Sequence, residues 1–407
     1  MVAEVIRFNL VGSMLLSNVV GFIVLPFVIK NWKTIPEMNG VLRGTFFIQI
    51  NVFILFVIFS VFFPWEDLSG YRSWGQQSFG RGFITLVRIL NEFILFYYII
   101  IIIKSRKVTL RFFLQLFFFM TLLSFVVAVV DRFIGYKIVD TLFYFRDNLA
   151  GRFVGLNGEP KVFGRANALA FAVVLIYKSE IKYFVPLVLL TTLGTFISLS
   201  ASSIILYFAF LFVIITYRRK NNVVIIMVLS LIMGSLVFIP SVLDLIPNKY
   251  GTTDKIKQVV GGDVSSGDED WVSNETFISK RFDIFDRLAL IYLFENPQYL
   301  AFGVGPNLIS IPASKYIPQN VIYAEEHRID SVPNNFINNT IATGGILYLL
   351  VWSVFLFNIF RFLRNDENAV LLFFIAMVLN MVFFSTLMYI LCAIALGFHL
   401  VKRIKIE

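Results

Sequence analysis

Long apolar runs alternate with short polar segments along the whole chain. Runs of about 20 apolar residues are typical of membrane-spanning helices, because a helix of that length crosses the hydrocarbon core. We predict an all-α, polytopic integral membrane protein with about 11 spans (roughly 10 to 12), forming a single transmembrane domain over 1–407. The predicted spans are 8–29, 44–64, 83–103, 112–130, 166–177, 183–199, 201–217, 223–242, 337–360, 369–385 and 386–400.

Three of these runs predict specific local structure. The run 166–177 is short, so we expect its helix to begin inside the preceding loop. The runs 183–217 and 369–400 are each too long for one span, so we predict that each forms a helical hairpin. The first hairpin is interrupted by four serines, Ser198, Ser200, Ser202 and Ser203.

Basic residues cluster in alternate short loops, which predicts the orientation of the spans. By the positive-inside rule these loops are cytoplasmic. Their basic residues are Lys30, Lys33, Arg43, Lys104, Arg106, Lys107, Arg111, Lys178, Lys182, Arg218, Arg219, Lys220, Arg361, Arg364, Lys402, Arg403 and Lys405. The C-terminus is then inside, and an odd number of spans places the N-terminus outside. The outer loops 65–82, 131–165 and 243–336 form the presumed catalytic face.

The composition supports a membrane protein and argues against a nucleic-acid partner and a disulfide framework. The chain is 58% hydrophobic and only 15% charged, with 47 phenylalanines, which a water-soluble core could not bury. The formal charge of +9 is largely accounted for by the orienting loops, so no nucleic-acid partner is expected. The single cysteine, Cys392, excludes a disulfide framework. The N-terminus lacks the pattern of a removed signal peptide.

The long outer loop begins with a polar stretch and continues into an apolar one. Residues 261–270 alternate acids with small residues but lack EF-hand spacing, so they indicate a solvated linker rather than a calcium site. Residues 277–294 carry apolar side chains at helical spacing and predict an amphipathic helix that bears Arg281 and Arg287.

The chain lacks the common catalytic motifs. It has no P-loop, no dinucleotide fingerprint, no H-E-x-x-H and no G-x-S-x-G, which argues against ATP-driven transport and common hydrolase mechanisms. With only His327 and His399, a multi-histidine metal centre is excluded. We therefore expect neither a metal nor a cofactor.

The segment 152–167 is the clearest local signal for ligand binding. Glycines at 151, 155, 158 and 164 let the backbone turn tightly and approach a ligand, while Arg152, Lys161 and Arg165 supply cations where a span begins. Such a loop suits a phosphate or diphosphate. Alternatively, both arginines extend to lipid headgroups. Glu159 is either an ion-pair partner of these cations or a general base.

A second polar signal runs from Pro297 to Gly345. A turn-rich stretch contains Gly303-Val304-Gly305, and Glu325-Glu326-His327-Arg328-Ile329-Asp330 then precedes a span that opens with Pro333-Asn334-Asn335. His327 could act as an acid or base near neutral pH, or it is a solvated loop histidine.

The predicted third span contains a charged pair. Arg88 and Glu92 are spaced i, i+4 on one helix face, with Asn91 between them. Charges at that depth are costly, so these residues either pair within the helix or line a polar cavity.

The order of these features resembles the O-antigen polymerase and O-antigen ligase superfamily, which are membrane glycosyltransferases that use polyprenyl-diphosphate-linked glycans. Many spans, one medium outer loop and one long outer loop followed by closing spans are similar over most of the chain. The local segments that resemble this family are the Arg152–Asn167 loop, the serines 198–203, Arg281, Arg287, Gly303-Val304-Gly305, Asn334-Asn335 and Gly344-Gly345.

The chain departs from the patterns of this superfamily at two places, and the first departure favours one branch over the other. Its ligases carry a His-Asn pair before the span, whereas this chain has Pro333-Asn334-Asn335, and His327 lies earlier. The missing histidine favours a polymerase over a ligase that transfers glycan to lipid A-core. The polymerases' described spacing from arginine to glycine is also missed by one residue between Arg152 and Gly164.

The resemblance implies a reaction and residue roles. A growing glycan would pass from undecaprenyl diphosphate to a new lipid-linked repeat unit at the periplasmic face of a bacterial inner membrane, without nucleotide or metal, on a GT-C-like fold. The diphosphate would bind at Arg152, Lys161, Arg165, Arg281, Arg287, Arg328, Asn334 and Asn335, and the catalytic residues would be drawn from Glu159, His327 and Asp330. The implied partners are lipid-linked oligosaccharides, membrane lipids and a chain-length-regulating membrane protein.

Two alternatives come from other classes. One is a purely structural or sensor role, because the sequence contains no motif with a low false-positive rate. The other is a flippase or exporter for lipid-linked oligosaccharides. Such a transporter would be expected to show two-fold internal symmetry and charges in many spans, neither of which the sequence contains.

Overall fold

The described helices form two compact units. The computed structural model describes residues 7–8, 14–31, 33, 39–58, 78–135, 138, 153–157, 160–218, 284–306, 308–309, 336–382 and 387–404. Unit 1 comprises Met1–Arg7, Val108–Arg281 and Leu371–Val378, and unit 2 comprises Phe8–Lys107, Phe282–Val370 and Leu379–Glu407. Apart from turns and one pair of two-residue strands, β1 (Arg7–Phe8) and β2 (Met14–Leu15), the described chain is helical, which confirms the all-α prediction.

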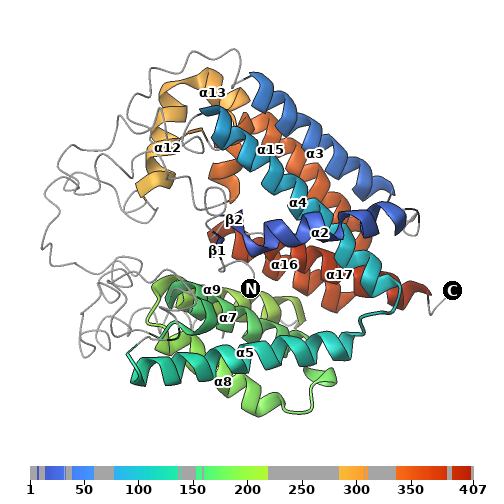
Figure 1. Ribbon diagram of the computed structural model, residues 1–407, viewed down its shortest axis with the longest axis vertical. Helices are drawn as coiled ribbons and strands as arrows, with labels where there is room; N and C mark the ends of the chain where they lie inside the picture. Colours follow the sequence, from blue (N-terminus) through green and yellow to red (C-terminus); the bar gives the residue numbers. More distant parts are fainter. Residues whose placement is uncertain are drawn as a thin grey trace, which may run out of the picture. The chain divides into compact units, whose positions relative to one another are not determined.

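Unit 1 is a helical bundle built around one central helix (Figure 1). Its elements are α5 (Leu110–Phe133), η6 (Gly155–Asn157), α7 (Pro160–Ile176), η7 (Lys178–Glu180), α8 (Phe184–Ile197) and α9 (Ala201–Arg218). α7 packs against α5, α8 and α9. Every residue from Ala168 to Val174 is buried, because small alanines at alternate positions let the neighbouring helices approach closely.

Hydrogen bonds fix the direction of the helices in this bundle. Arg218, at the end of α9, donates from its guanidinium to the carbonyls of Leu175 and Ile176 at 2.9 and 2.6 Å. These carbonyls belong to the last turn of α7, where a cation satisfies groups that have no partner within the helix. α7 and α9 therefore end at the same side of the bundle, near the basic residues Lys178 and Lys182.

Unit 2 is held together by an aromatic core. Its helices are α2 (Leu16–Asn31), α3 (Asn39–Val57), α4 (Ser78–Lys104), α12 (Ile284–Glu295), α13 (Pro297–Phe302), α15 (Phe336–Leu363), α17 (Leu387–Ile404) and both ends of α16 (Glu367–Val382). Phe93 of α4 stacks on Trp352 of α15 and meets Tyr389 of α17 edge to face, at centroid distances of 6.3 and 5.4 Å. These large rings join three helices that lie far apart in the sequence.

The predicted spans overlap the described helices, but the first one begins later than predicted. Phe8 and Met14–Leu15 lie in short strands, and α2 begins at Leu16. Ten of the eleven predicted runs coincide with a helix, and the run 223–242 lies outside the described residues. The short fifth run begins early, at Pro160, and the serine-rich hairpin breaks between α8 and α9 as predicted. Three helices, Thr85–Lys104, Leu110–Phe133 and Phe336–Leu363, are long and apolar enough to cross a membrane. The total number of spans stays a prediction.

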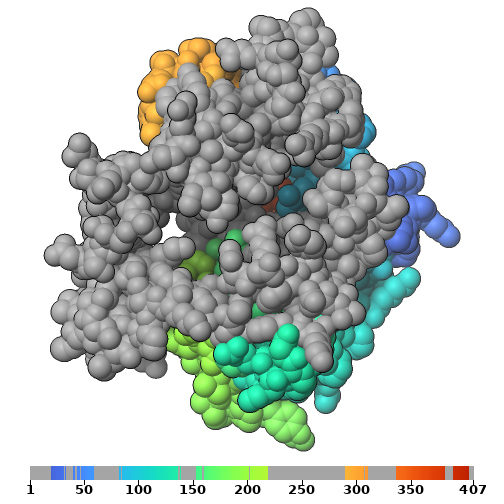
Figure 2. Space-filling view, turned by 60° about the vertical axis from the view of Figure 1, so that its left-hand side comes forward, coloured from blue at the N-terminus to red at the C-terminus, as the bar shows by residue number. Residues whose placement is uncertain are grey.

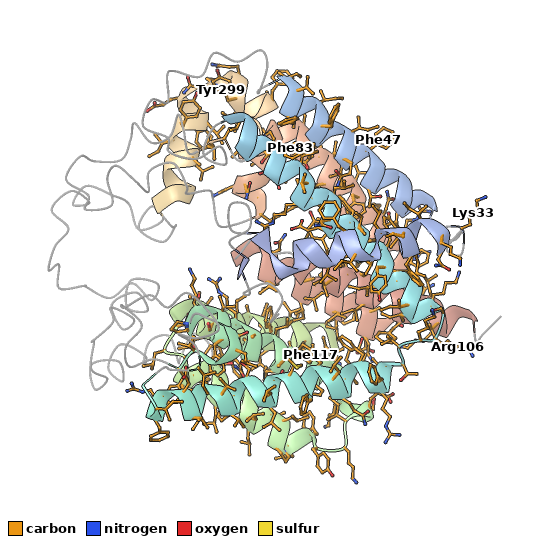
Figure 3. All side chains as sticks on the ribbon, in the orientation of Figure 1. Lys33, Phe47, Phe83, Arg106, Phe117 and Tyr299 are labelled. Carbon is orange, nitrogen blue, oxygen red and sulfur yellow. The ribbon has the colours of Figure 1, made fainter. Side chains whose placement is uncertain are left out.

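Several helices carry large apolar side chains on their outer surfaces. Phe47 of α3 is 59% exposed and points away from the helices of unit 2 (Figure 3). Phe119 of α5 is 59% exposed, and Phe133 at the end of α5 is 85% exposed. Exposed apolar faces of this kind suit contact with lipid rather than water.

The predicted amphipathic helix is present in part, as α12. Tyr292 and Leu293 are buried with Ala289 in a cluster that also holds Val304 and Ala342, whereas Ile291 is 37% exposed. α12 and α13 lie at the surface of the molecule, drawn in orange in Figure 2.

α15 has a kink that accommodates the segment after α13. Gly344 and Gly345 depart from helical geometry, with φ of −142° and +70°. The kink leaves the carbonyls of Ala342 and Thr343 to accept hydrogen bonds from the N–H groups of Val304 and Gly305, at 2.8 and 3.0 Å. Gly345 is required here, since a Cβ would overlap the Ala301 carbonyl.

An ion pair closes the turn between α15 and α16. Lys402 Nζ, from the end of α17, lies 2.9 and 3.0 Å from the two carboxylate oxygens of Asp366, and His399 Nδ1 lies 3.8 Å from Oδ2. Burial opposes ionisation of Asp366, but His399, Lys402 and the Ala369 N–H outweigh it and lower its pKa to about 2.

Gly345→Ala should lower the free energy of unfolding by about 3 kcal/mol, combining the strain of positive φ with overlap against backbone. Gly135→Ala is the matched control, because Gly135 has φ of +74° but nothing within 4 Å of an added Cβ. Its cost should be only about 1 kcal/mol. Thermal unfolding in detergent measures both, and equal losses would mean that the contact with α13 contributes nothing.

Asp366→Asn should destabilise the protein near neutral pH by about 1 kcal/mol, since the half-exposed Lys402 keeps the pair screened. Because the folded-state pKa lies below the ordinary value of 3.8, this stabilisation is present above pH 4 and is lost as the pH falls towards 2. Unfolding curves at pH 6 and pH 2.5 check this. The gap between wild type and variant should close at the lower pH, and a constant gap would refute the ion-pair account.

Candidate functional site

The candidate site lies at the end of unit 1 where α7 begins, opposite the basic end that Arg218 closes. It brings together two segments that the sequence analysis singled out separately. These are the start of α7, within the segment 152–167, and the serine turn, which we define as residues 198–203 between α8 and α9. We call their meeting point the α7 serine site.

Arg165 joins these two segments directly. Its Nε donates a hydrogen bond to Ser202 Oγ at 3.2 Å, across 37 positions of the sequence. Arg165 lies just after the first turn of α7 and is partly buried. The hydrogen bond fixes the plane of the guanidinium, so the cation is held in position before any ligand arrives.

Gly164 makes the close approach possible. An added Cβ at this position would overlap the hydroxyls of both Ser198 and Ser203. Ser203 Oγ also donates to the carbonyl of Lys161 at 3.1 Å, in the first turn of α7. The serine turn therefore lies directly on the α7 backbone, and only glycine fits between them.

The hydroxyls of α8 extend this polar region into the bundle. Thr195 Oγ1 donates to the Thr191 carbonyl at 2.8 Å, and Ser198 Oγ donates to the Thr195 carbonyl at 2.7 Å. Asn167 of α7 donates to the Phe163 carbonyl at 2.8 Å, and its Oδ1 is buried without a hydrogen-bond partner beside Gly194. These groups are buried in the bundle next to the site.

The segment before α7 is anchored by α5. Ser124 Oγ accepts hydrogen bonds from Asn157 Nδ2 at 2.9 Å and from the Leu156 N–H at 3.2 Å. Gly155 adopts φ of +58°, and an added Cβ would overlap the Ser124 carbonyl. The positive φ of Gly155 confirms that it serves a tight turn. Gly155 and Gly164 both lie against other parts of the protein, so the predicted approach of this backbone to a ligand stays a prediction.

The electrostatics at this end of α7 favour an anion. α7 begins with Pro160 and has no acidic residue in its first turn, while Glu159, which directly precedes it, lies outside the described residues. Lys161 is exposed in that turn, and Arg165 follows one turn later. A phosphate at this place would meet a helix N-terminus and two cations.

Most of the other predicted site residues lie outside the described part of the chain. These are Arg152, Glu159, Arg281, His327, Arg328, Asp330, Asn334 and Asn335. Arg287 lies in α12, where its side chain is not described. The predicted meeting of arginines from the two outer loops, and the choice of a general base, therefore stay predictions.

The Arg88–Glu92 pair is confirmed as an ion pair within one helix. Arg88 Nε lies 3.2 Å from Glu92 Oε1 in α4, and Glu92 is almost completely buried. Asn91 is also buried, and its side chain lies so close to position 21 of α2 that only glycine fits there. The buried carboxylate is compensated locally, as its depth in unit 2 requires.

Ser124 of α5 was not predicted from the sequence to be part of this site. Ser124 belongs to a buried row on α5 with Thr121, Ala128 and Asp131, spaced three and four residues apart. A small and polar row at helical spacing within an otherwise apolar span is the signal that could have found it.

Among the residues that the structure describes, no group of three or more His, Cys, Asp or Glu could hold a metal ion. Comparison of the chain with protein-family models, with curated proteins and with solved structures finds no match.

Proposed function

We propose that this protein is a polytopic membrane glycosyltransferase of the polymerase type, with about 11 spans and a GT-C-like fold. It would transfer a growing glycan from its undecaprenyl diphosphate carrier to a new lipid-linked repeat unit at the periplasmic face of a bacterial inner membrane. The observation that carries the proposal is the hydrogen bond from Arg165 to Ser202, because it joins two segments on which the resemblance to these enzymes rests.

The position of the α7 serine site supports the proposed orientation. Lys178, Lys182 and Arg218 lie at one end of the α7–α9 bundle, and Arg165 with the serine turn lies at the other. Under the positive-inside rule the basic end is cytoplasmic, so the α7 serine site would face the periplasm. The proposed reaction uses lipid-linked glycans on that face of the membrane.

The proposed reaction needs a cation to stabilise the departing diphosphate, and an arginine can supply that charge without a metal ion. The acceptor hydroxyl oxygen forms a bond to the anomeric carbon of the donor sugar, while the bond from that carbon to the diphosphate oxygen breaks. The hydroxyl proton passes to a base, for which Glu159, His327 and Asp330 are the candidates. Negative charge develops on the departing diphosphate, and a guanidinium fixed beforehand at the α7 N-terminus stabilises it.

Arg165→Gln should lower the rate of chain growth by about 100-fold, because it removes a cation that acts on the developing charge. Arg165→Lys keeps the charge but not the planar donor pair and should retain an intermediate rate. Ser202→Ala only releases the guanidinium and should cost about fivefold. Purified protein with a lipid-linked repeat unit, without nucleotide, gives the rate from glycan ladders.

Arg218→Gln is the matched control, since it removes a guanidinium from the opposite end of the same helices. It should lower the unfolding temperature but leave the rate per folded molecule unchanged. Equal loss of activity in Arg165→Gln and Arg218→Gln would show that Arg165 contributes to stability alone. Wild-type ladders from Arg165→Gln would remove the α7 serine site from the reaction.

A further inference from the structure

A second polar site lies in unit 2, within the part of the chain that the structure describes. It is a pocket of about 710 Å³ where the end of α15, the start of α16, the end of α17 and the start of α3 meet. Its charged lining residues are Arg361, Arg364, Asp366, Glu367 and Lys402. We call it the Arg361 pocket. The sequence analysis treated its arginines and lysine only as orienting charges.

The acid at the floor of this pocket is already neutralised. Asp366 accepts from Lys402 at 3.0 Å and from the Ala369 N–H at 3.4 Å, and His399 lies beside it. His399 Nδ1 is buried without a hydrogen-bond partner. Lys402 and Asp366 therefore offset each other. Of the other charged residues that line the pocket, Arg361 and Arg364 outnumber the one acid, Glu367, so a ligand meets a net positive charge.

Arg361 and Arg364 are not neutralised in this way. Among the residues that the structure describes, neither has a carboxylate within ion-pair distance, and both are exposed. They lie three residues apart, at the last turn of α15 and just after it, which places both on the same pocket. Two guanidiniums that converge on one cavity are typical of sites for phosphate groups.

The start of α3 adds to this preference. Gly40 and Val41, in the first turn of α3, also line the pocket, and that turn contains no acidic residue. Gly40 has nothing within 4 Å of an added Cβ, so the backbone is open to the cavity at this point. The helix N-terminus and the two arginines all favour a negatively charged ligand.

We propose that the Arg361 pocket binds a phosphate ester, held between the guanidiniums of Arg361 and Arg364 and the N-terminal turn of α3. The site is independent of the proposed glycosyl transfer and lies among basic residues predicted to be cytoplasmic. The phosphate belongs either to the headgroup of an anionic phospholipid or to a soluble metabolite, and the two sources share the same chemistry at the pocket.

The experiment measures binding to the full-length protein in a neutral detergent by native mass spectrometry. The probes are phosphatidylglycerol, phosphatidylcholine and glycerol 3-phosphate. In the variant with both Arg361→Gln and Arg364→Gln, phosphatidylglycerol or glycerol 3-phosphate should bind at least about tenfold more weakly than in the wild type. Gly40→Leu should have a similar effect without any change of charge, because its side chain fills open space in the pocket.

The matched control carries Arg106→Gln and Arg111→Gln, which remove two exposed arginines from another basic turn (Arg106, Figure 3). Binding to this control should equal that of the wild type. Displacement of phosphatidylglycerol by glycerol 3-phosphate at similar concentration would identify a soluble ligand, and its failure to displace would identify a lipid headgroup. Unchanged binding in either pocket variant, or an equal loss in the control, would overturn the proposal.

Discussion

The close contact between the α7 backbone and the serine turn is the constraint on which the candidate site depends. Gly164 leaves no room for a side chain beneath the hydroxyls of Ser198 and Ser203, so the two segments can approach until Arg165 reaches Ser202. Any residue larger than glycine would separate them and release the guanidinium. Position 164 therefore links the packing of unit 1 to the placement of a cation.

The same principle appears in unit 2, where glycines allow backbone to meet backbone. The kink at Gly344 and Gly345 exposes carbonyls of α15, and the N–H groups of Val304 and Gly305 satisfy them. These hydrogen bonds fix the segment after α13 onto α15, and Tyr299 and Leu300 of α13 pack against the cluster that includes Ala342 of α15. In both units, glycine-containing segments therefore make close contacts between backbone and neighbouring groups.

Much of the fold could be predicted because apolar periodicity and breaks are local properties. Pro160 marks an early start for α7, the serines interrupt the run 183–217, and the i, i+4 spacing of Arg88 and Glu92 predicts their pairing. The contacts between segments could not be predicted in this way. Ser124 and Asn157 are 33 positions apart, and Asp366 and Lys402 are 36 apart. No local pattern specifies which distant polar groups will meet.

The most direct test of the central claim is a structure of the protein with a polyprenyl-diphosphate-linked glycan bound. The account predicts diphosphate density within hydrogen-bond distance of the Arg165 guanidinium, beside Lys161 at the start of α7, while the serine turn keeps its place on Gly164. Diphosphate density elsewhere, with Arg165 still bound to Ser202 and touching no phosphate oxygen, would contradict it.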